Sequence, residues 1–317
     1  MRYPTLFVLL AIICFSGHRS QAQTPQLAIR YFEAAQKKMD EGDWVAAAEN
    51  FTKAIATNAR LKGVKSTKKS AQPFDESRSD STEISVSDPF TAHAYVNRGA
   101  AWFYRAEFDQ AVADYERAIR INPRLAQAYL GRGAARNAQG DRDEAMRDYD
   151  RALKIDEGLY EAHNNRGALR YDLRDFDGAL LDLDRAIAID AKRPEAYFHR
   201  GYVFLEKESF AAGVADFDRA LELKPGFAWA QHGRGTALMK QGKLNLAVKG
   251  FTAALELDPG IAEAYGNRGL ALIPLGKETE AGPDLKRCVE LKPEMKTDIE
   301  RRTDLAKKMI RDAAPEH

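Results

Sequence analysis

The sequence is dominated by a repeat with a fixed period. The dipeptide Arg-Gly occurs six times from 98/99 to 268/269, each time 34 residues after the previous one. A period of this length is typical of stacked repeat folds, because each unit leaves an apolar face that only its neighbours can cover. The chain is therefore expected to fold as an array of similar units and not around one enlarged core.

The array is contiguous over residues 92–295. Its six copies cover residues 92–125, 126–159, 160–193, 194–227, 228–261 and 262–295. A divergent copy precedes them at residues 28–61, where Ala34-Ala35 replaces Arg-Gly. Within the copies, apolar residues recur at helical spacing in two segments around turns such as Gly140 and Gly242. Each copy thus predicts two helices, and the fold class is all-α.

Small and large residues occupy fixed positions, counted from the first residue of each copy. In the copy at 126–159, Gly133 at position 8 and Ala145 at position 20 accompany Tyr149 at position 24. This combination lets two helices approach closely while the large side chain fills the remaining gap. We therefore expect substitution of a position-8 glycine by leucine to be severely destabilising.

Two further segments interrupt or end the array. Residues 62–91 are rich in Ser, Lys and Asp and poor in apolar residues, which predicts a flexible insert. Residues 294–312 predict an amphipathic segment, with an apolar side formed by Met295, Ile299, Leu305, Met309 and Ile310. The capping helix is expected at 296–312 within it.

The last copy departs from the pattern through two prolines. Pro274 falls in the final turn of its first helix, and Pro283 falls where the second helix should be under way. Since proline cannot donate a backbone hydrogen bond, the second helix is expected either to begin at Gly282-Pro283 or to be kinked there.

The first 22 residues predict a signal peptide. Met1-Arg2 is followed by an apolar run at 5–15 that is too short to span a bilayer, and Ser20-Gln21-Ala22 offers small residues for cleavage. An uncleaved anchor is the alternative. Cleavage after Ala22 predicts an exported protein without a transmembrane segment, periplasmic in a bacterium and otherwise secreted or in the secretory lumen. It also leaves Cys288 as the single cysteine, at a position that predicts buried packing.

Charge and motifs argue against several classes of function. Lys and Arg number 48 against 47 Asp and Glu, which favours neither nucleic acid nor an anionic membrane as partner. Histidines do not cluster at metal-ligand spacing, and no Ser-His-Asp, Cys-His or phosphate-binding pattern occurs. We therefore expect no metal, no cofactor and no catalytic residues.

Arginine and aspartate recur together across the copies. Position 7 is Arg in all six contiguous copies and position 23 is Asp in five, with Gly250 as the exception. This predicts a structural ladder of ion pairs and leaves Arg234 without a partner; a ligand-binding array of arginines is the alternative. The expected pairs are Arg98–Asp114, Arg132–Asp148, Arg166–Asp182, Arg200–Asp216 and Arg268–Asp284.

These copies resemble tetratricopeptide repeats. The family pattern has small residues at positions 8, 20 and 27, aromatic residues or Leu at 4, 11 and 24, and Pro at 32. The resemblance implies a right-handed superhelical solenoid of about seven helix-turn-helix repeats plus the capping helix. In the family the first helices line a concave groove that usually binds peptides or protein segments. Arg at position 7 departs from the family, where this position is commonly apolar.

The resemblance also implies that positions 2, 5, 9, 12 and 13 of each first helix face the groove. Aromatic and Met side chains there suit an apolar peptide or an amphipathic helix, although several could instead pack against the next repeat. The candidate groove residues are Asn164, Tyr171, Phe198, Tyr202, Trp229, His232 and Met239.

The leading hypothesis is therefore a non-enzymatic scaffold that binds a peptide or protein segment in the groove. One alternative is a structural or assembly subunit of a cell-envelope or export complex that uses its convex face or its ends. Another is an accessory protein whose aromatic groove contacts a sugar chain.

Overall fold

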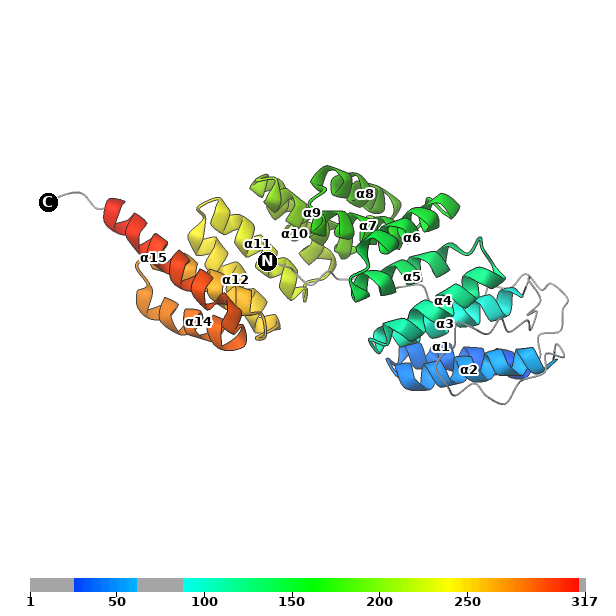
Figure 1. Ribbon diagram of the computed structural model, residues 1–317. Helices are drawn as coiled ribbons and strands as arrows, with labels where there is room; N and C mark the ends of the chain where they lie inside the picture. The colour runs from blue at the N-terminus through cyan, green and yellow to red at the C-terminus, as the bar shows by residue number, and fades with distance from the viewer. Residues whose placement is uncertain (1–25, 62–87, 314–317) are drawn as a thin grey trace. The chain divides into compact units, whose positions relative to one another are not determined.

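A computed structural model describes residues 26–61 and 88–313 (Figure 1). These residues form fifteen α-helices and two short 3-10 helices, and the described ranges contain no strand. The all-α fold class is confirmed. The signal peptide expected at 1–22 and most of the insert expected at 62–91 lie outside the described residues. None of the described helices is long and apolar enough to cross a membrane.

The chain divides into two compact units between Leu169 and Arg170, within α7. The helices of the first unit are α1 (Gln26–Asp40), α2 (Trp44–Leu61), α3 (Pro89–Tyr104), α4 (Phe108–Ile121), α5 (Ala126–Gln139), α6 (Arg142–Ile155) and most of α7 (Tyr160–Asp172). Helix α3 begins before Ala92, so the repeat that it opens starts earlier than the sequence pattern indicates. Pro89 explains this start, because proline is well tolerated in the first turn of a helix.

The second unit continues the same alternation of helices. It contains α8 (Phe176–Ile189), α9 (Pro194–Glu206), α10 (Phe210–Leu223), α11 (Ala228–Lys240), α12 (Leu244–Leu257), α13 (Ala262–Leu272), η1 (Ile273–Leu275), α14 (Glu278–Leu291), η2 (Pro293–Met295) and α15 (Lys296–Ala313).

Successive helices pack against each other in both units. In the first, α1 pairs with α2, α3 with α4 and α5 with α6, and α2 and α4 also pack against the first helix of the next repeat. In the second unit, α9 pairs with α10, α11 with α12 and α13 with α14, and α10 and α12 also pack against the first helix of the next repeat. Left-handed backbone closes several of these turns, at Gly140 and Gly242 with φ of 96° and 73°. Glycine adopts that conformation without steric cost, which explains its place there.

The large residue at position 24 holds neighbouring helices together. Phe217 is fully buried, and it packs against Gly201 of its own repeat and against Gly233 of the next. A Cβ atom added at Gly201 or Gly233 would lie within 2.8 Å of the Phe217 ring. The close approach expected within a repeat is therefore present, and a second close approach joins this repeat to the one that follows, as Tyr115 and Gly131 do earlier in the chain.

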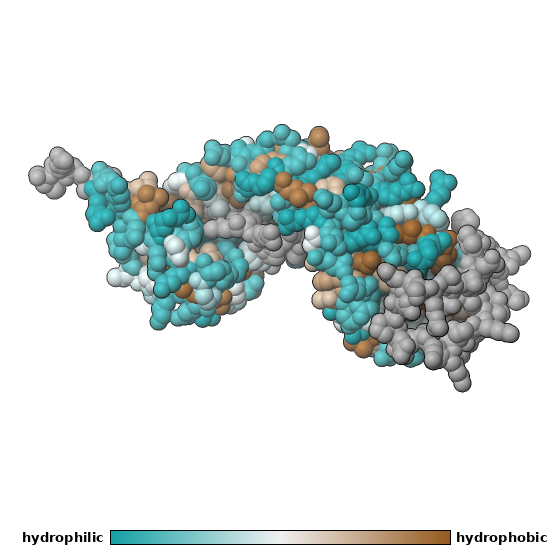
Figure 2. All heavy atoms as spheres, viewed as in Figure 1, coloured by the Kyte–Doolittle hydropathy of each residue, from teal (hydrophilic) through white to brown (hydrophobic). Residues whose placement is uncertain are grey.

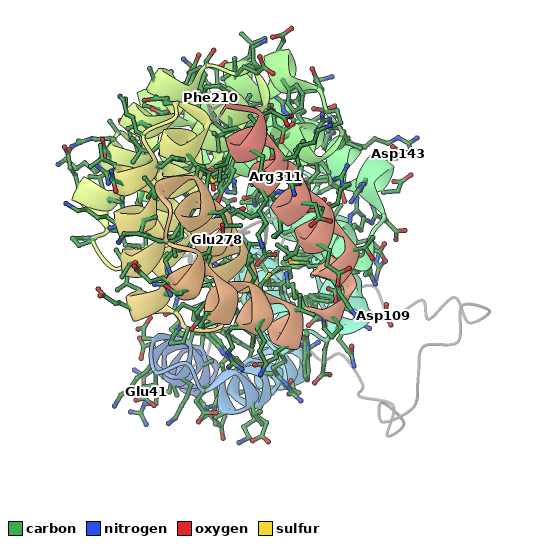
Figure 3. The ribbon with its side chains drawn as sticks, turned by 90° about the vertical axis from the view of Figure 1, so that its left-hand side faces the viewer. Glu41, Asp109, Asp143, Phe210, Glu278 and Arg311 are labelled. Atoms are coloured by element: carbon green, nitrogen blue, oxygen red, sulfur yellow. The ribbon has the colours of Figure 1, made fainter. Side chains whose placement is uncertain are left out.

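The last repeat and α15 differ from the sequence expectations in two ways. Helix α14 begins at Glu278 and continues through Pro283, so the expectation of a late start at Gly282 is wrong. Ile299 is buried, but Leu305, Met309 and Ile310 are exposed, so the single apolar side expected for the capping helix is also wrong. Leu305 follows Ile299 by six residues, which turns it about 240° around the helix. Ile310 lies beyond the end of the last repeat. Figure 3 labels Glu278 on α14 and Arg311 on α15.

Candidate functional site

The arginines at position 7 bind the aspartates at position 23 within their own repeats. Arg200 donates from Nε and Nη2 to the two carboxylate oxygens of Asp216, at 2.7 and 2.8 Å. The same bidentate geometry, which combines charge with two hydrogen bonds, recurs in the pairs Arg98–Asp114, Arg132–Asp148 and Arg268–Asp284.

The fifth expected pair, Arg166–Asp182, would join residues of two units that are described separately. Asp182 accepts a hydrogen bond from Arg170 at 2.8 Å, and Arg166 donates to Asp150 at 2.6 Å. The Arg166–Asp182 pair therefore stays a prediction.

The position-7 arginines have a second partner that the sequence analysis missed. Each one reaches position 25 of the preceding repeat, where an acidic residue or threonine is present. Arg200 donates to Asp184 at 2.6 Å, and Arg234 donates to Asp218 at 2.5 Å. The expectation that Arg234 lacks a partner is therefore wrong, because its partner lies in the preceding repeat and not in its own. The other contacts are Arg98–Thr52, Arg132–Glu116, Arg166–Asp150 and Arg268–Thr252.

These contacts make the arginine ladder a set of links between repeats. In the link at Arg200, the end at Asp216 is buried, whereas the end at Asp184 is open to solvent. The Arg200 guanidinium also lies over the ring of Tyr197, 5.7 Å from its centroid. The hydrogen bond to Asp216 is the main cause that raises the pKa of Arg200. Buried carboxylates occupy four of the guanidinium groups, those of Arg98, Arg132, Arg200 and Arg268. The geometry at these four therefore favours a structural role over a ligand-binding array.

A cluster of aromatic side chains surrounds α9 in the second unit. Phe198 stacks on Phe227 with ring centroids 4.6 Å apart, and it meets Tyr202 edge-on at 5.0 Å. Tyr202 in turn lies 5.1 Å from the Phe217 ring. Such contacts between rings add stability beyond the area that they bury, so this cluster forms a rigid base for the residues around it.

Burial separates the seven candidate groove residues into two sets. Asn164, Phe198, Tyr202 and His232 are buried, so the expectation that these four side chains line an open groove is wrong in this structure. Three of these side chains are covered by the next repeat: Phe198 packs against Phe227, just before α11. Tyr202 contacts Trp229 on α11, and His232 contacts Asn267 on α13. Asn164 belongs to the first unit, apart from the other six in the second. The partly exposed candidates are Tyr171, Trp229 and Met239.

Tyr171 and Trp229, which are both partly exposed, each contact the buried Tyr202, the first through its ring and the second through its backbone. The Tyr171 ring lies 6.5 Å from that of Tyr202, and the Tyr202 hydroxyl donates to the backbone carbonyl of Trp229 at 3.4 Å. We call Tyr171, Tyr202 and Trp229 the aromatic surface. Met239 lies separately, against the core around Phe251.

His232 stands at the centre of a buried chain of hydrogen bonds. Asn267 Nδ2 lies 3.1 Å from His232 Nε2, and His232 Nδ1 lies 3.4 Å from the Tyr202 hydroxyl. Donation by Asn267 to Nε2 assigns the ring proton to Nδ1, which donates to Tyr202. Burial lowers the pKa of His232 to about 4, while the charge of Glu263 acts in the opposite direction. The ring is therefore neutral at pH 7.

The chain extends to α15 through a residue that sequence reasoning also missed. Arg302 donates to Asn267 Oδ1 at 3.2 Å, so hydrogen bonds run from α15 through α13 and α11 to Tyr202 on α9. The sequence signal for this chain of hydrogen bonds is the presence of polar residues at positions 5 and 6 of the repeats, such as His232 and Asn267. Their hydrogen bonds form between repeats, so the pattern within one repeat does not predict them.

The described residues hold no group of three His, Cys, Asp or Glu side chains that could bind a metal. Cys288 is buried, as its position predicted, and burial raises the pKa of its thiol.

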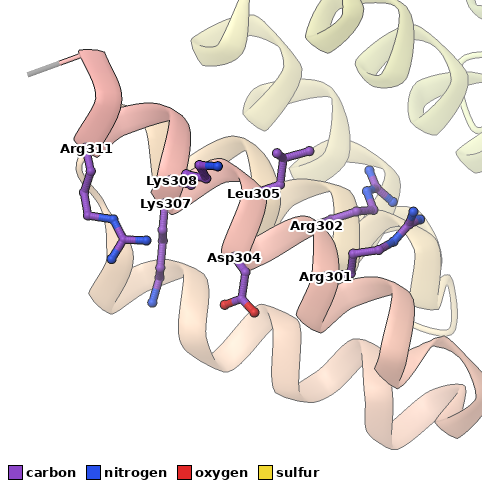
Figure 4. A pocket seen from close by; sticks show the side chains of 7 residues that line it. All are labelled: Arg301, Arg302, Asp304, Leu305, Lys307, Lys308 and Arg311. Atoms are coloured by element: carbon purple, nitrogen blue, oxygen red, sulfur yellow. The ribbon is translucent and has the colours of Figure 1, made fainter.

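A second candidate surface surrounds the outer half of α15 (Figure 4). A hollow of about 780 Å³ there is lined by five basic side chains together with Asp304 and Leu305. Lys307 is paired with Glu278 at 3.4 Å. Figure 2 shows apolar surface toward this end of α15, where Met309 and Ile310 are exposed.

Comparison with protein families agrees with this architecture. Models of the tetratricopeptide repeat match residues 92–125, 126–158, 164–226 and 232–295. These matches together cover more than half of the chain, which therefore belongs to the tetratricopeptide repeat family. Repeats of this family mediate contacts between proteins and are generally non-catalytic.

Solved structures share the fold at low sequence identity. A chain of the APC/C hetero-tetramer Cut9-Hcn1 is similar with a TM-score of 0.62 and 19% identity, over 67% of this chain and 42% of that one. This protein thus spans less than half the length of that relative. PilF of Pseudomonas aeruginosa gives a TM-score of 0.59 at 19% identity, over 66% of this chain and 96% of that one.

A tetratricopeptide repeat protein from Parabacteroides merdae is similar over more of the chain. Its TM-score is 0.58 at 18% identity, and the match covers 89% of this chain and 99% of that one. A search of curated proteins found no match. At these identities the structural likeness concerns the fold alone.

Proposed function

We propose that this protein is a non-enzymatic scaffold that binds a peptide or protein segment on the aromatic surface of its second unit. The observation that carries the proposal is that two partly exposed aromatic residues contact the buried Tyr202: the Tyr171 ring lies near its ring, and the Trp229 backbone carbonyl accepts a hydrogen bond from its hydroxyl. Membership of a protein-interaction family supports the class of ligand.

The chemistry of the surface indicates which segments it would bind. Ring edges present apolar area with few rotatable bonds, so little conformational entropy is lost when a ligand covers them. Below them, Phe198 and Phe217 hold Tyr202 in place. A segment with one or two large apolar side chains fits such a surface best, because anchor residues in preformed sites dominate peptide affinity.

The test is a peptide-display selection against residues 23–317, followed by titration of the selected peptides. We expect Trp229→Ala and Tyr171→Ala each to weaken binding about tenfold or more, as loss of an anchor contact does. Leu181→Ala on α8 is the matched control, since this exposed apolar residue lies on a second helix and should leave affinity unchanged. Phe198→Ala is unsuitable, because Phe198 is buried and its loss would destabilise the unit.

Two results would argue against this proposal. Selected peptides that bind both variants as tightly as the unsubstituted protein would place the ligand elsewhere. A screen that yields no peptide but finds oligosaccharides sensitive to Trp229→Ala would favour the sugar-binding alternative, because aromatic faces also stack on sugar rings.

We also propose that the protein acts in an exported compartment. The charged start, short apolar run and small residues at 20–22 support a cleaved signal peptide. Mass spectrometry of the full-length chain, expressed in a cell that exports it, should find a mature N-terminus at Gln23. An intact Met1 in the cytoplasmic fraction would contradict the proposal.

A further inference from the structure

The hydrogen bonds that run from α15 to α9 all point in one direction. Arginine has no acceptor, so Arg302 on α15 can only donate, and it donates to Asn267 Oδ1 at 3.2 Å. The Asn267 amide nitrogen therefore faces His232 Nε2 at 3.1 Å, and the ring proton is on Nδ1, beside the Tyr202 hydroxyl. The arginine at one end thus determines the direction of every bond in the chain.

This direction requires a neutral His232. An imidazolium ring carries a proton on both nitrogens, so Nε2 becomes a donor and meets the amide nitrogen of Asn267, which is also a donor. A half-turn of the Asn267 amide removes this conflict, because it brings the amide oxygen to His232. The same half-turn places the amide nitrogen against Arg302, which cannot accept a hydrogen bond. Protonation of His232 therefore breaks the bond between Asn267 and Arg302.

The two ends of the chain respond differently to the proton. At α9, Nδ1 is a donor in both charge states of the ring, so the Tyr202 hydroxyl keeps its partner. At α15, Arg302 loses its acceptor. The Arg302 side chain is 27% exposed, whereas Asn267 and His232 are buried. The break thus falls at the end where water can replace the lost partner.

The lost bond belongs to the contact that holds α15 on α13. Its apolar part is Ile299, which is buried against Gly266; a Cβ atom added at Gly266 would lie 2.9 Å from Ile299 Cδ1. Its polar part is the bond from Arg302, about one helical turn farther along α15 (Figure 4), to Asn267. A hydrogen bond from a charged group is among the stronger polar contacts. Its loss should therefore loosen α15.

The surroundings of His232 favour the neutral ring while α15 is in place. Burial lowers the pKa of His232 to about 4, and the charge of Glu263 acts in the opposite direction. Lys292 Nζ lies 2.5 Å from the Glu263 carboxylate and offsets its charge. The groups that face His232 from the helices packed around it are Tyr202 on α9, Phe251 on α12, Glu263 and Asn267 on α13 and, behind Asn267, Arg302 on α15.

We propose that this chain of hydrogen bonds is an acid-sensitive switch for α15. Protonation of His232 turns the Asn267 amide, removes the acceptor of Arg302 and releases α15 from α13, while the contact between α9 and α11 persists. Release lets water reach His232, so the released state binds the proton more tightly and its population rises as the pH falls from 6.5 toward 4. It also uncovers Ile299 and the surface of α13 around Gly266. The switch does not depend on the proposed function.

The test is hydrogen exchange of residues 23–317, followed by mass spectrometry at pH 6.5 and 4.5 and corrected for the intrinsic exchange rate at each pH. We expect the protection of α15 amides to fall about tenfold or more at pH 4.5, as loss of a charged hydrogen bond predicts. Protection of α11 amides should change less than about twofold, because the contact with α9 persists.

Three variants separate this switch from other effects of acid. Glutamine does not titrate, so His232→Gln should remove most of the pH dependence of α15. The carboxylate of Asn267→Asp accepts from Arg302 and from the imidazolium at once, so α15 should stay protected at pH 4.5. Glu278→Gln is the control: it removes the exposed pair with Lys307, and should leave the pH dependence of α15 intact.

Nitrogen NMR of the histidine-labelled, unsubstituted protein checks the switch without a substitution that affects folding. The His232 signal, identified by its loss in His232→Gln, should show the proton on Nδ1 at pH 6.5 and should titrate together with the release of α15. A proton on Nε2 at pH 6.5, unchanged α15 protection, or α11 loosening as much as α15 would each overturn the proposal. So would an acid effect of the same size in His232→Gln and Asn267→Asp.

Discussion

The repeat at 194–227 and the last repeat at 262–295 contain the same pattern of residues but are completed differently. In the former, Phe217 is closed in by Gly201 on one side and by Gly233 of the following repeat on the other. In the latter, Leu285 meets Gly269 and stays partly exposed. Each of these repeats therefore supplies one half of the packing around its position-24 side chain, and where another repeat follows, it supplies the other half.

The polar contacts show the same dependence on neighbours. Arg200 has two carboxylate partners, one in its own repeat and one in the preceding repeat. Arg234 has Asp218 of the preceding repeat, and position 23 of its own repeat is Gly250. Each contact with the preceding repeat couples two adjacent repeats. The number of completed contacts should therefore determine how much a substitution destabilises each repeat.

The largest contrast is expected between two glycines. Gly201→Leu should prevent the α9–α10 pair from closing, since even a Cβ atom there lies 2.8 Å from Phe217, and the loss should exceed about 4 kcal/mol. Gly282→Ala on α14 meets no atom within 4 Å and should stabilise the helix by up to about 1 kcal/mol. Denaturant unfolding followed by circular dichroism measures both. Similar losses for the two variants would contradict the comparison.

Removal of the position-24 side chain should show the next contrast. Phe217→Ala leaves a cavity between two repeats and should cost about 3–5 kcal/mol. Leu285→Ala should cost about 1–2 kcal/mol, because part of the side chain already contacts water. The midpoint and slope of urea unfolding give these values. A Leu285→Ala loss equal to that of Phe217→Ala would indicate that α15 completes the last repeat after all.

Acid should weaken the hydrogen-bond chain that joins Tyr202, in the repeat at 194–227, to α15. The pKa of His232 is about 4 in the folded protein, below the ordinary value of 6.5, so the unfolded chain binds the proton first. Stability from this residue is therefore fully present above pH 6.5 and decreases as the pH falls to 4, by about 3 kcal/mol in total.

His232→Gln provides the comparison for that measurement. Glutamine can keep hydrogen bonds but does not titrate, so the variant should be less stable at pH 7 and should lose less stability between pH 6.5 and pH 4.5. Urea unfolding at a series of pH values measures the difference. The same pH dependence in both proteins would exclude His232 as the source.

The smallest contrast concerns the arginine ladder. Arg200→Ala removes contacts to Asp216 and Asp184 and leaves the Asp216 carboxylate without its arginine, so it should cost about 2–3 kcal/mol. Arg234→Ala removes only a pair that is largely open to solvent and should cost less than about 1 kcal/mol. Thermal and urea unfolding of the two variants, at low and high salt, test the ranking. Equal costs would show that the buried pair contributes no more than the exposed one.

Several features of this protein could be predicted from the sequence because they repeat in register. The period of 34 residues identified the units, and helical spacing identified the helices within them. The pairing of Arg200 with Asp216 could be inferred because the two residue types occur together in most copies. Such contacts lie within one helical pair, where sequence separation and geometry are closely linked.

Other features depended on the tertiary structure, because they arise where one repeat meets the next. Asp218 follows the same periodic pattern, but only the packing of α11 on α10 places it beside Arg234. Phe198 has the apolar character of a groove residue, and contact with Phe227 buries it. Ile310 has the spacing of a buried residue and is exposed because the last repeat ends before it. A sequence pattern specifies which side of a helix is apolar, and the neighbouring elements determine whether that side is covered.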